Sequence, residues 1–428
     1  MTNLKFEQFK KSNLKLKELD SIRVKNFKKF ETKGFPTKKQ EHWKYTDLKN
    51  IISRDFDELN IFSENKLSKI NNNFLIKNFE HNQIILLNGN FIDSNFDLED
   101  KKRISVKSLK DSFRIKKDFD EIKNFFEDDQ NSLITLNNAL TNDGVIFKID
   151  DNYSFKKPLI IYNFFNKSSH NKIINNKVFL TLGSGSQLSL IDYYESEDNI
   201  KYFNNSIHNY SIKKNAILKK YNINNNLNKS YNYNSTKVKS YSNSVFENFL
   251  LSTGPNLIKN EVHCDLLESF SSCFINSIML LKDEQHHELK TNVNHLYEDC
   301  KSSQLVKSVL LNSSNGTYQG KIYVDKNAQK TNGYQLSKAL ILSENSEFNS
   351  KPELEIYADD VKCSHGSTSG NIDENSIFYL MSRGLTKDQA RKMIIKGFLN
   401  EVIETITDLN VKKLISELFI DNMNKTTL

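Results

Sequence analysis

The chain has 428 residues, which is enough for two or three domains with sizeable cores. Its 60 Lys and Arg against 53 Asp and Glu give a net charge of +7, and 37% of its residues are hydrophobic, so the composition excludes a disordered chain. With 13 Gly and 4 Pro it is no collagen-like fibre, and apolar runs such as residues 159–162 are too short to cross a bilayer. We therefore expect a globular protein without a membrane span.

The N-terminus, the cysteine count and the distribution of charge predict the compartment and the kind of partner. The N-terminus has no apolar signal segment, and four cysteines are too few for a disulfide framework in a chain of this size. Both observations predict a cytoplasmic protein. The lysines are scattered among Asn and Asp along the whole chain, which favours a solvated surface over nucleic acid as a partner.

Residues 1–60 have a helical pattern. Apolar residues recur at mixed spacings, mostly of three to five positions, from Leu4 to Phe30, and the Gly-Phe-Pro segment at 34–36 predicts the end of this stretch. Thr37 and Gln40 fit a capping box, which predicts a short second helix that begins at Thr37. That helix would carry Trp43, the only tryptophan, which we expect to be a packing anchor.

From about residue 145 the apolar residues recur with period two. Val145, Phe147 and Ile149 share one face, and a similar alternation runs from residue 318 to 325. Turn-like clusters near residues 183, 213, 253, 282, 313 and 343 recur mostly at about thirty-residue spacing, with a longer gap between 213 and 253. Four strands are expected at about 287–296, 303–312, 316–326 and 331–343, which is two strands per thirty residues.

A repeat of two strands without an intervening helix predicts a flattened parallel β-helix, in which each turn adds one strand to each of two sheets. An antiparallel β-sandwich is the alternative, but it would usually need more Gly and Pro at its hairpins. The expected fold is mainly β. A parallel β-helix core at residues 145–360 lies between an N-terminal region (1–144), helical to about residue 60 and then mixed, and a C-terminal helical domain (361–428).

The C-terminal region has clear helix signals. Asp373 is a candidate N-cap for a short helix that ends before Gly384, and Thr386 with Gln389 forms a second capping-box pattern. A last helix is expected over residues 411–419. Amphipathic helices after a β domain either pack on it or dock a partner, and the pattern alone leaves both interpretations open.

The residues with metal-binding chemistry are few. Cys363 and His365 follow Asp359 and Asp360, and a thiolate, an imidazole and carboxylates together suit iron or zinc, although a single Cys-x-His lacks the four-ligand spacing of structural zinc sites. No Walker A or GxGxxG motif follows a strand. By alternation, residues 287 and 295 share one strand face, and we expect both histidines to point inward as hydrogen-bonded groups.

Three long segments resemble one family. Residues 351–367 (KPELEIYADDVKCSHGS) and 378–384 (FYLMSRG) resemble the C-terminal motif of the SufB/SufD family of the SUF iron–sulfur cluster assembly system. Residues 35–48 resemble its N-terminal motif, and residues 320–324 with 328–331 resemble its β-helix core. SufB members have an essential strand cysteine near the position of residues 335–337, and its absence here favours the SufD branch.

The resemblance implies a right-handed parallel β-helix flanked by helical regions, and a non-catalytic scaffold subunit that helps to build and deliver nascent clusters. It implies two partners: SufB, paired β-helix to β-helix, and the ATPase SufC, bound by the C-terminal helices. A homodimer is the alternative when the chain is alone. It implies no tightly bound cofactor, a transient iron or iron–sulfur cluster shared with SufB, and room for a flavin on the complex.

The resemblance also points to residues. The histidine of the Cys-Ser-His-Gly motif, here His365, is linked to cluster assembly at the SufB interface and is the expected transient iron ligand, with Cys363 as its companion. Asp359 and Asp360 are expected to oppose ionisation of this thiol. The proline that the family has shortly after the counterpart of His295 is absent here, which leaves that residue without an assigned role.

Two surfaces are expected to bind the partners. Strands at 316–343 are expected to form the edge that joins SufB, because unpaired strand edges invite pairing. On the C-terminal helix, Met393, Ile394, Phe398 and Val402 are expected to be partly buried, and the SufC-binding candidates are Arg391, Ile395, Phe398 and Glu401. A secreted polysaccharide lyase and a purely structural interaction protein are the alternatives from other classes.

Overall fold

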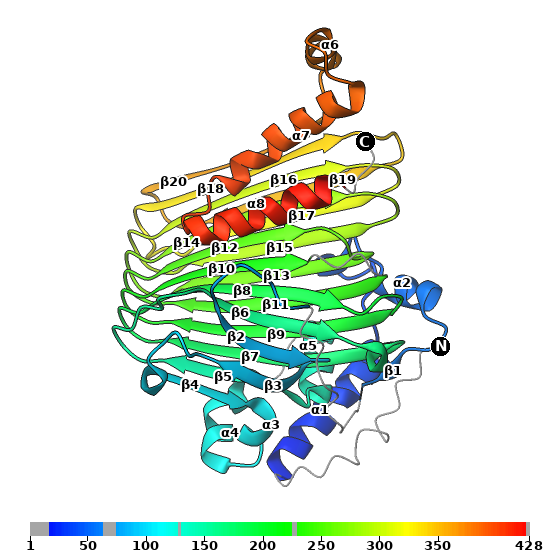
Figure 1. Cartoon of the computed structure of the whole chain (residues 1–428). Coiled ribbons are helices and arrows are strands. Elements are labelled where there is room, and N and C mark those ends of the chain that lie inside the picture. Colours follow the sequence, from blue (N-terminus) through cyan, green and yellow to red (C-terminus); the bar gives the residue numbers. More distant parts are fainter. Residues whose placement is uncertain (1–16, 63–73, 127–129, 225–228, 425–428) are drawn as a thin grey trace.

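The computed structural model describes residues 17–62, 74–126, 130–224 and 229–424. It confirms the parallel β-helix: two ten-stranded sheets face each other, and from β5 onward the coiled chain alternates between them (Figure 1). At the N-terminal end, β3 pairs antiparallel with β2, and β4 pairs antiparallel with β5. The strand order is β19-β17-β15-β13-β11-β9-β7-β5-β4 in the first sheet, where β1 also pairs with β7, and β20-β18-β16-β14-β12-β10-β8-β6-β2-β3 in the second. The antiparallel sandwich is therefore excluded.

The strands of the first sheet are β1 (Asn60–Ile61), β4 (Ile104–Ser108), β5 (Asp143–Ile149), β7 (Lys172–Leu182), β9 (Tyr202–Ile212), β11 (Ser230–Ser240), β13 (Leu257–Leu266), β15 (His286–His295), β17 (Asn315–Val324) and β19 (Glu347–Ile356). Those of the second are β2 (Asn82–Leu87), β3 (Asn90–Asn95), β6 (Leu159–Phe165), β8 (Gln187–Ser196), β10 (Ile217–Asn224), β12 (Val245–Ser252), β14 (Ser272–Leu281), β16 (Lys301–Leu310), β18 (Thr331–Ile341) and β20 (Val361–Gly370). The four strands expected between 287 and 343 match β15 to β18 closely.

The strands stack in constant register, so residues at equivalent positions form columns along the coil. For example, Ile275, Gln304, Gln335 and His365 are successive partners on β14, β16, β18 and β20. Because side chains alternate along a strand, a whole column points either into the space between the sheets or outward. The inward columns form the main apolar core, which includes Leu190, Ile275, Val293 and Tyr318.

The residues at the corners of the coil explain how the chain turns between the sheets with so few Gly and Pro residues. Residues with a left-handed backbone recur at one corner at 215, 243, 270, 299 and 330. Asn and Asp adopt this conformation more readily than other non-glycine residues, and Asn215, Asn243 and Asp299 take this role, whereas Phe270 and Lys330 are exceptions. The corner at Asn243 fills the long gap between the turn clusters near residues 213 and 253.

The helical parts of the N-terminal region cover the outer face of the first sheet, whereas its strands β2 and β3 extend the second sheet. Helix α1 (Lys17–Lys33) ends at Gly34, whose φ of +66° confirms the predicted stop, whereas the apolar residues before 17 lie outside the described residues. The helix predicted to begin at Thr37 is wrong: the 3₁₀ helix η2 (Glu41–Trp43) begins after Gln40, and α2 (Leu48–Asp55) is capped by Asp47. The remaining short elements are η4 (Lys101–Arg103), α3 (Leu109–Ser112), α4 (Lys116–Ile122), η5 (Lys123–Phe126), α5 (Ser132–Leu140) and η6 (Lys167–Ser169).

Trp43 is the predicted packing anchor. It is buried, and its ring stacks on Tyr233 of β11 with 5.8 Å between ring centroids. Phe27 and Phe30 of α1, together with Trp43, belong to one apolar cluster with the outward-facing Ile207. The N-terminal segment is thereby held against the first sheet.

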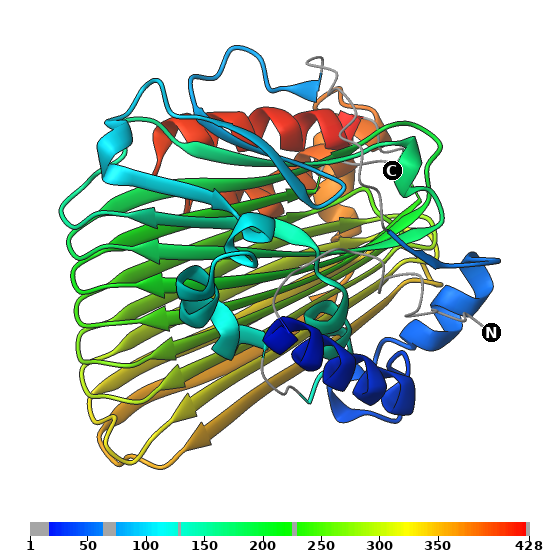
Figure 2. The ribbon, with the colours of Figure 1, turned by 90° about the horizontal axis from the view of Figure 1, so that it is seen from below.

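The C-terminal helices lie on the other side of the solenoid (Figure 2). Helices α6 (Glu374–Ser382), α7 (Lys387–Ile403) and α8 (Leu409–Asn424) follow β20, and the caps predicted at Asp373 and Thr386 are present. The residues of α7 and α8 share an apolar cluster with the outer face of the second sheet. Residues 361–370 form strand β20, so the solenoid ends after Gly370 and not at residue 360. No helix among the described residues is long and apolar enough to span a membrane.

Candidate functional site at the open end of the solenoid

The last coil of the solenoid leaves two strand edges open. Within the described chain, β19 pairs only with β17, and β20 pairs only with β18. The edge predicted at residues 316–343 is therefore wrong, because β17 and β18 are each covered by a further strand. Ile322 and Val324 are also fully buried inside the coil. The unpaired backbone groups of this end belong to residues 347–370.

His365 and Cys363 lie on β20, in columns that face the interior of the coil. His365 pairs in register with Gln335, and its side chain is exposed because no further coil covers it. Cys363 pairs with Gly333 and is half-buried; a Cβ atom at Gly333 would lie 3.4 Å from the Cys363 Sγ. Because residues 363 and 365 share a strand face, the motif places an imidazole and a thiol side by side at the open end.

The protonation of Cys363 follows from burial. Burial raises the pKa of the Cys363 thiol, and a hydrogen bond with the Gly333 backbone partly offsets the rise. The expected direction is confirmed, but the cause is desolvation and not the carboxylates. Asp359 and Asp360 are exposed in the turn before β20, where the Asp360 amide donates to Gln329 Oε1 at 3.0 Å. No group of three or more His, Cys, Asp or Glu side chains gathers anywhere in the described parts of the chain.

A polar lining continues inward from His365. Gln335 is buried, and neither polar atom of its side-chain amide has a hydrogen-bond partner among the described residues. One coil deeper, the Tyr318 hydroxyl donates to Gln304 Oε1 at 2.9 Å. Nearer the end, the Ser337 hydroxyl lies 3.0 Å from Ser367 Oγ. Sequence reasoning missed these residues, although the inward register of each strand was the signal that could have found them.

The two inward histidines are confirmed as hydrogen-bonded interior groups. His287 Nε2 lies 2.8 Å from the Pro255 carbonyl oxygen, and His295 Nε2 lies 2.8 Å from Ser302 Oγ. Burial lowers the pKa of both histidines to about 4, so both are neutral at physiological pH. Their contacts give them a structural role.

On the C-terminal helices, the structure corrects the expected orientation of α7. Ile395 is fully buried against the second sheet and cannot contact a partner, whereas Met393, expected to be partly buried, is exposed. Phe398 and Glu401 both contact Lys307 of β16: the Lys307 ammonium lies 4.4 Å from the Phe398 ring centroid and pairs with the Glu401 carboxylate. Arg391 is half-buried, and its guanidinium lies 4.0 Å from the Glu374 carboxylate of α6.

The apolar surface that α6 and α7 leave exposed lies elsewhere. Phe378 is 73% exposed, and Tyr379, Met381 and Met393 are exposed as well. Figure 1 shows α6 projecting beyond the end of the solenoid. Exposed apolar and aromatic side chains on consecutive helices are typical of a protein–protein contact. We call Phe378, Tyr379, Met381 and Met393 the α6–α7 patch.

Comparisons with known proteins agree with these features. The family model described as "SUF system FeS cluster assembly, SufBD core domain" matches residues 164–398, and "SufBD protein N-terminal region" matches residues 6–161. The chain is similar to the iron–sulfur cluster assembly protein SufD of Escherichia coli K12, at 26% identity over 384 residues, which is 89% of this chain and 87% of that protein. It is also similar to the chloroplastic protein ABCI7 of Arabidopsis thaliana, at 28% identity over 56% of this chain and 51% of the relative. An iron–sulfur cluster assembly SufBD family protein of Synechocystis sp. is 41% identical over 24% of this chain and 23% of the relative. With its solenoid core and its N-terminal region both matched, the chain belongs to the SufBD family of SUF-system iron–sulfur cluster assembly proteins.

Proposed function

We propose that this chain is a non-catalytic, SufD-like scaffold subunit of a cytoplasmic complex that builds and delivers iron–sulfur clusters. It pairs with a SufB-type paralogue through the open end of its solenoid and binds a SufC-type ATPase through its C-terminal helices. The observation that carries the proposal is the position of His365: its exposed imidazole lies on an unpaired edge strand. The similarity to E. coli SufD over most of both chains supports this assignment.

The open end has the properties of a strand-pairing surface. The unpaired N–H and C=O groups of β19 and β20 are a template for strands of another chain. Inward-facing apolar residues at this end are also incompletely covered: Phe348 and Leu354 are half-buried, and Ile356 is exposed. A second solenoid end with matching strands would cover these residues and form hydrogen bonds with the unpaired N–H and C=O groups of β19 and β20. Without SufB, a second copy of this chain offers the same edges, and size-exclusion chromatography of the isolated protein tests for such a homodimer.

At this joint, His365 is the first choice as a ligand for iron or a nascent cluster, which is the cargo of the complex. A neutral imidazole donates a lone pair to iron, and its position on the open edge gives access from a partner. Cys363 ranks second because burial raises the pKa of its thiol and so disfavours the thiolate. Two donors are fewer than the four that hold a cluster, so the partner chain supplies the others.

The α6–α7 patch is the surface that we assign to the ATPase. Its exposed aromatic and methionine side chains are the residue types that are enriched at interfaces. Arg391, near the patch, and the exposed carboxylate of Glu401 remain candidates for its polar rim, whereas Ile395 is withdrawn because it is buried. A flavin on the assembled complex stays a prediction that the visible absorbance spectrum of the purified complex tests.

The test is cluster assembly in cells in which this chain is the sole SufD-type subunit. We expect His365→Ala to leave the three-subunit complex intact on co-purification and to reduce the activity of iron–sulfur enzymes strongly, with a smaller effect for Cys363→Ser. His170→Ala, at an exposed position between η6 and β7, is the matched control and should have normal activity. Normal cluster assembly by the His365→Ala complex would contradict the ligand role.

A further inference from the structure

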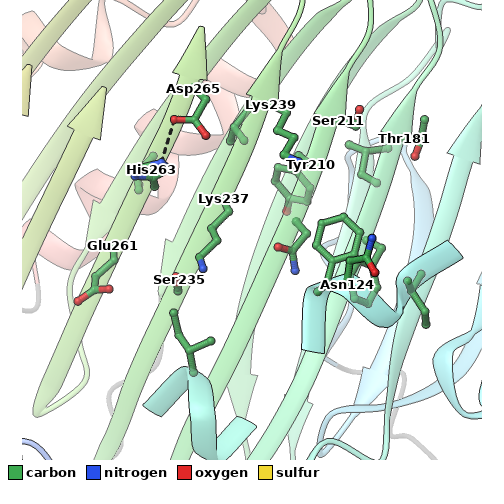
Figure 3. Close-up of a pocket in the computed structure, with 18 of the residues that line it drawn as sticks. Asn124, Thr181, Tyr210, Ser211, Ser235, Lys237, Lys239, Glu261, His263 and Asp265 are labelled. Atoms are coloured by element: carbon green, nitrogen blue, oxygen red, sulfur yellow. Dashed lines mark hydrogen bonds and ion pairs between the residues drawn. The ribbon is translucent and has the colours of Figure 1, made fainter. Parts of the chain in front are cut away.

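A groove of about 950 Å³ lies on the outer face of the first sheet, on the side of the solenoid opposite the C-terminal helices (Figure 3). Its floor consists of outward-facing side chains of β7, β9, β11, β13 and β15. Asn124 and Phe125 of η5, with Asn131 and Ile134 near the start of α5, form one wall. The groove therefore lies between the N-terminal region and the sheet, and the proposed cluster site does not use it.

Hydrogen-bond donors gather in the part of the floor formed by β9 and β11. Asn209 and Lys237 are partners in register, and so are Ser211 and Lys239. All four side chains line the groove, and two of them carry ammonium groups. Figure 3 shows Lys237 and Lys239 on one strand, with Ser211 on its neighbour. Asn209, Ser211 and Lys239 suit an oxyanion because each offers an N–H or O–H group, and Lys237 adds a second positive charge.

Asn209 gives an independent indication of a ligand. Asn209 is only 7% exposed, and its side-chain Nδ2 has no hydrogen-bond acceptor among the described residues. Buried amide groups in folded proteins almost always have a hydrogen-bond partner, and a missing partner costs about 1–3 kcal/mol. A bound acceptor in the groove would satisfy this group.

Acceptors lie in the part of the floor formed by β13 and β15. Glu261 Oε1 and Asn292 Oδ1 are buried atoms that accept no hydrogen bond among the described residues, although the Lys259 ammonium lies 3.9 Å from this Glu261 oxygen. Asp265, in contrast, is already engaged, because one of its oxygens lies 2.9 Å from His263 Nε2 and 2.7 Å from Asn294 Nδ2. The floor thus changes from donors to acceptors across neighbouring strands.

An aromatic surface completes the groove. Phe125 is 40% exposed, and its ring centroid lies 5.2 Å from that of Phe179 on β7. An exposed phenylalanine beside a cavity offers a face on which a planar ring can stack. The groove volume of about 950 Å³ also lies within the range typical of small-molecule binding sites.

We propose that this groove binds a nucleoside phosphate. Its phosphate oxygens accept from Lys239, Asn209 and Ser211, with Lys237 as a second nearby positive charge, and its hydroxyl or amino groups donate to Glu261 and Asn292. Its base packs against Phe125. Inorganic phosphate shares the anionic part of this chemistry, but it can use neither the aromatic face nor the acceptors. Lysine binds phosphate as a point charge, so a large part of the affinity is electrostatic.

The test is calorimetric titration of the purified full chain, without an ATPase subunit, using ADP and inorganic pyrophosphate as probes. We expect ADP to bind more tightly than pyrophosphate. Lys239→Met, at an exposed position, should weaken both probes by about tenfold, which corresponds to about 1.4 kcal/mol. Phe125→Ala should remove the preference for ADP and leave pyrophosphate binding unchanged.

Lys321→Met is the matched control, because Lys321 lies on the same outer face, on β17, but does not line the groove. It should change neither affinity, and thermal unfolding should show that all three variants are folded. The proposal is overturned if the wild-type chain binds neither probe at millimolar concentration, or if Lys321→Met weakens binding as much as Lys239→Met. It is also overturned if pyrophosphate binds as tightly as ADP. None of these outcomes bears on the role of His365 in cluster assembly.

Discussion

Lys259 and Glu288 form an ion pair that is completely buried where the N-terminal segment crosses the first sheet. The Lys259 ammonium lies 4.5 Å from the centroid of the Trp43 ring and donates to the His42 carbonyl oxygen at 3.1 Å. The Thr46 hydroxyl donates to the Glu288 carboxylate. The pair therefore joins β13 and β15 to the segment that carries the tryptophan.

Removing one member of this pair should destabilise the fold more than removing both. Lys259→Met leaves the Glu288 carboxylate buried without its counter-charge, and we expect a loss of about 3–5 kcal/mol in the free energy of unfolding. Lys259→Met combined with Glu288→Leu should recover much of that loss. Urea unfolding followed by circular dichroism measures both values, and a double variant less stable than Lys259→Met would contradict the prediction.

The stability of the fold should fall in mild acid. Burial lowers the pKa of His208, His286, His287 and His295 to about 4 in the folded chain, whereas an unfolded histidine titrates near ~6.5. Between these values the unfolded state binds more protons, so the free energy of unfolding decreases as pH falls from ~6.5 towards 4. Each histidine contributes up to about 1.4 kcal/mol per pH unit.

Urea unfolding at several pH values measures this slope. His295→Asn should reduce it by the contribution of one proton, because His295 makes one hydrogen bond, to Ser302, that a smaller amide can replace. A pH-independent free energy of unfolding over this range would show that the interior histidines are not neutral.

Pairing with SufB should depend on the inner surface of the open end. Ile356 faces the interior column of β19 but is exposed, so Ile356→Lys introduces a charge where a partner solenoid would exclude water, without disturbing the folded core. We expect at least a tenfold loss in SufB affinity, measured by titration of purified subunits. Tyr357→Lys changes the exposed neighbour and is the control. Equal effects of the two substitutions would place the interface elsewhere.

Binding of SufC should depend on the α6–α7 patch. Phe378→Ser removes its most exposed aromatic ring, and the loss of a central interface aromatic typically costs about 2 kcal/mol or more of binding free energy. Leu409→Ser on α8 is the control, since Leu409 is 77% exposed but lies outside the patch. Pull-down of SufC with each variant distinguishes binding through the α6–α7 patch from binding through α8. Undiminished binding by Phe378→Ser would contradict the assignment.

The solenoid was predictable because its pattern is local and repeated. Alternation over residues 287–295 assigned the correct inward face of β15, and the thirty-residue spacing implied two strands per turn. The pattern fails at residues 361–370, which are rich in Ser, Gly and Thr and have no apolar alternation. These residues form β20 because β18 offers an open edge with which they pair. This is a tertiary contact, and no local sequence pattern predicts it.

Which side of helix α7 faces the sheet was harder to predict, because this also depends on tertiary contacts. Helix α7 has apolar residues on more than one side, with Met393 exposed and Ile395 buried, so periodicity alone does not say which side meets the sheet. The capping-box pattern at Thr37 was overridden because contacts of Trp43 and Thr46 with the sheet hold that segment as a 3₁₀ turn. The groove was invisible in the sequence, since its wall at residues 124–134 and its floor at residues 179–292 meet only in the folded chain.

The constant register of the stacked strands also limits how this gene can change in length. Inserting or deleting one codon within a strand between β7 and β18 would reverse which side chains of the remaining strand face the core, exposing a core residue such as Val293 and burying a polar neighbour such as Asn294. Adding or removing a complete coil would instead preserve every contact on both sides of the junction. Viable length variants of the core should therefore differ by whole coils or by loop residues at the corners, and a library of random in-frame insertions would show this spacing directly.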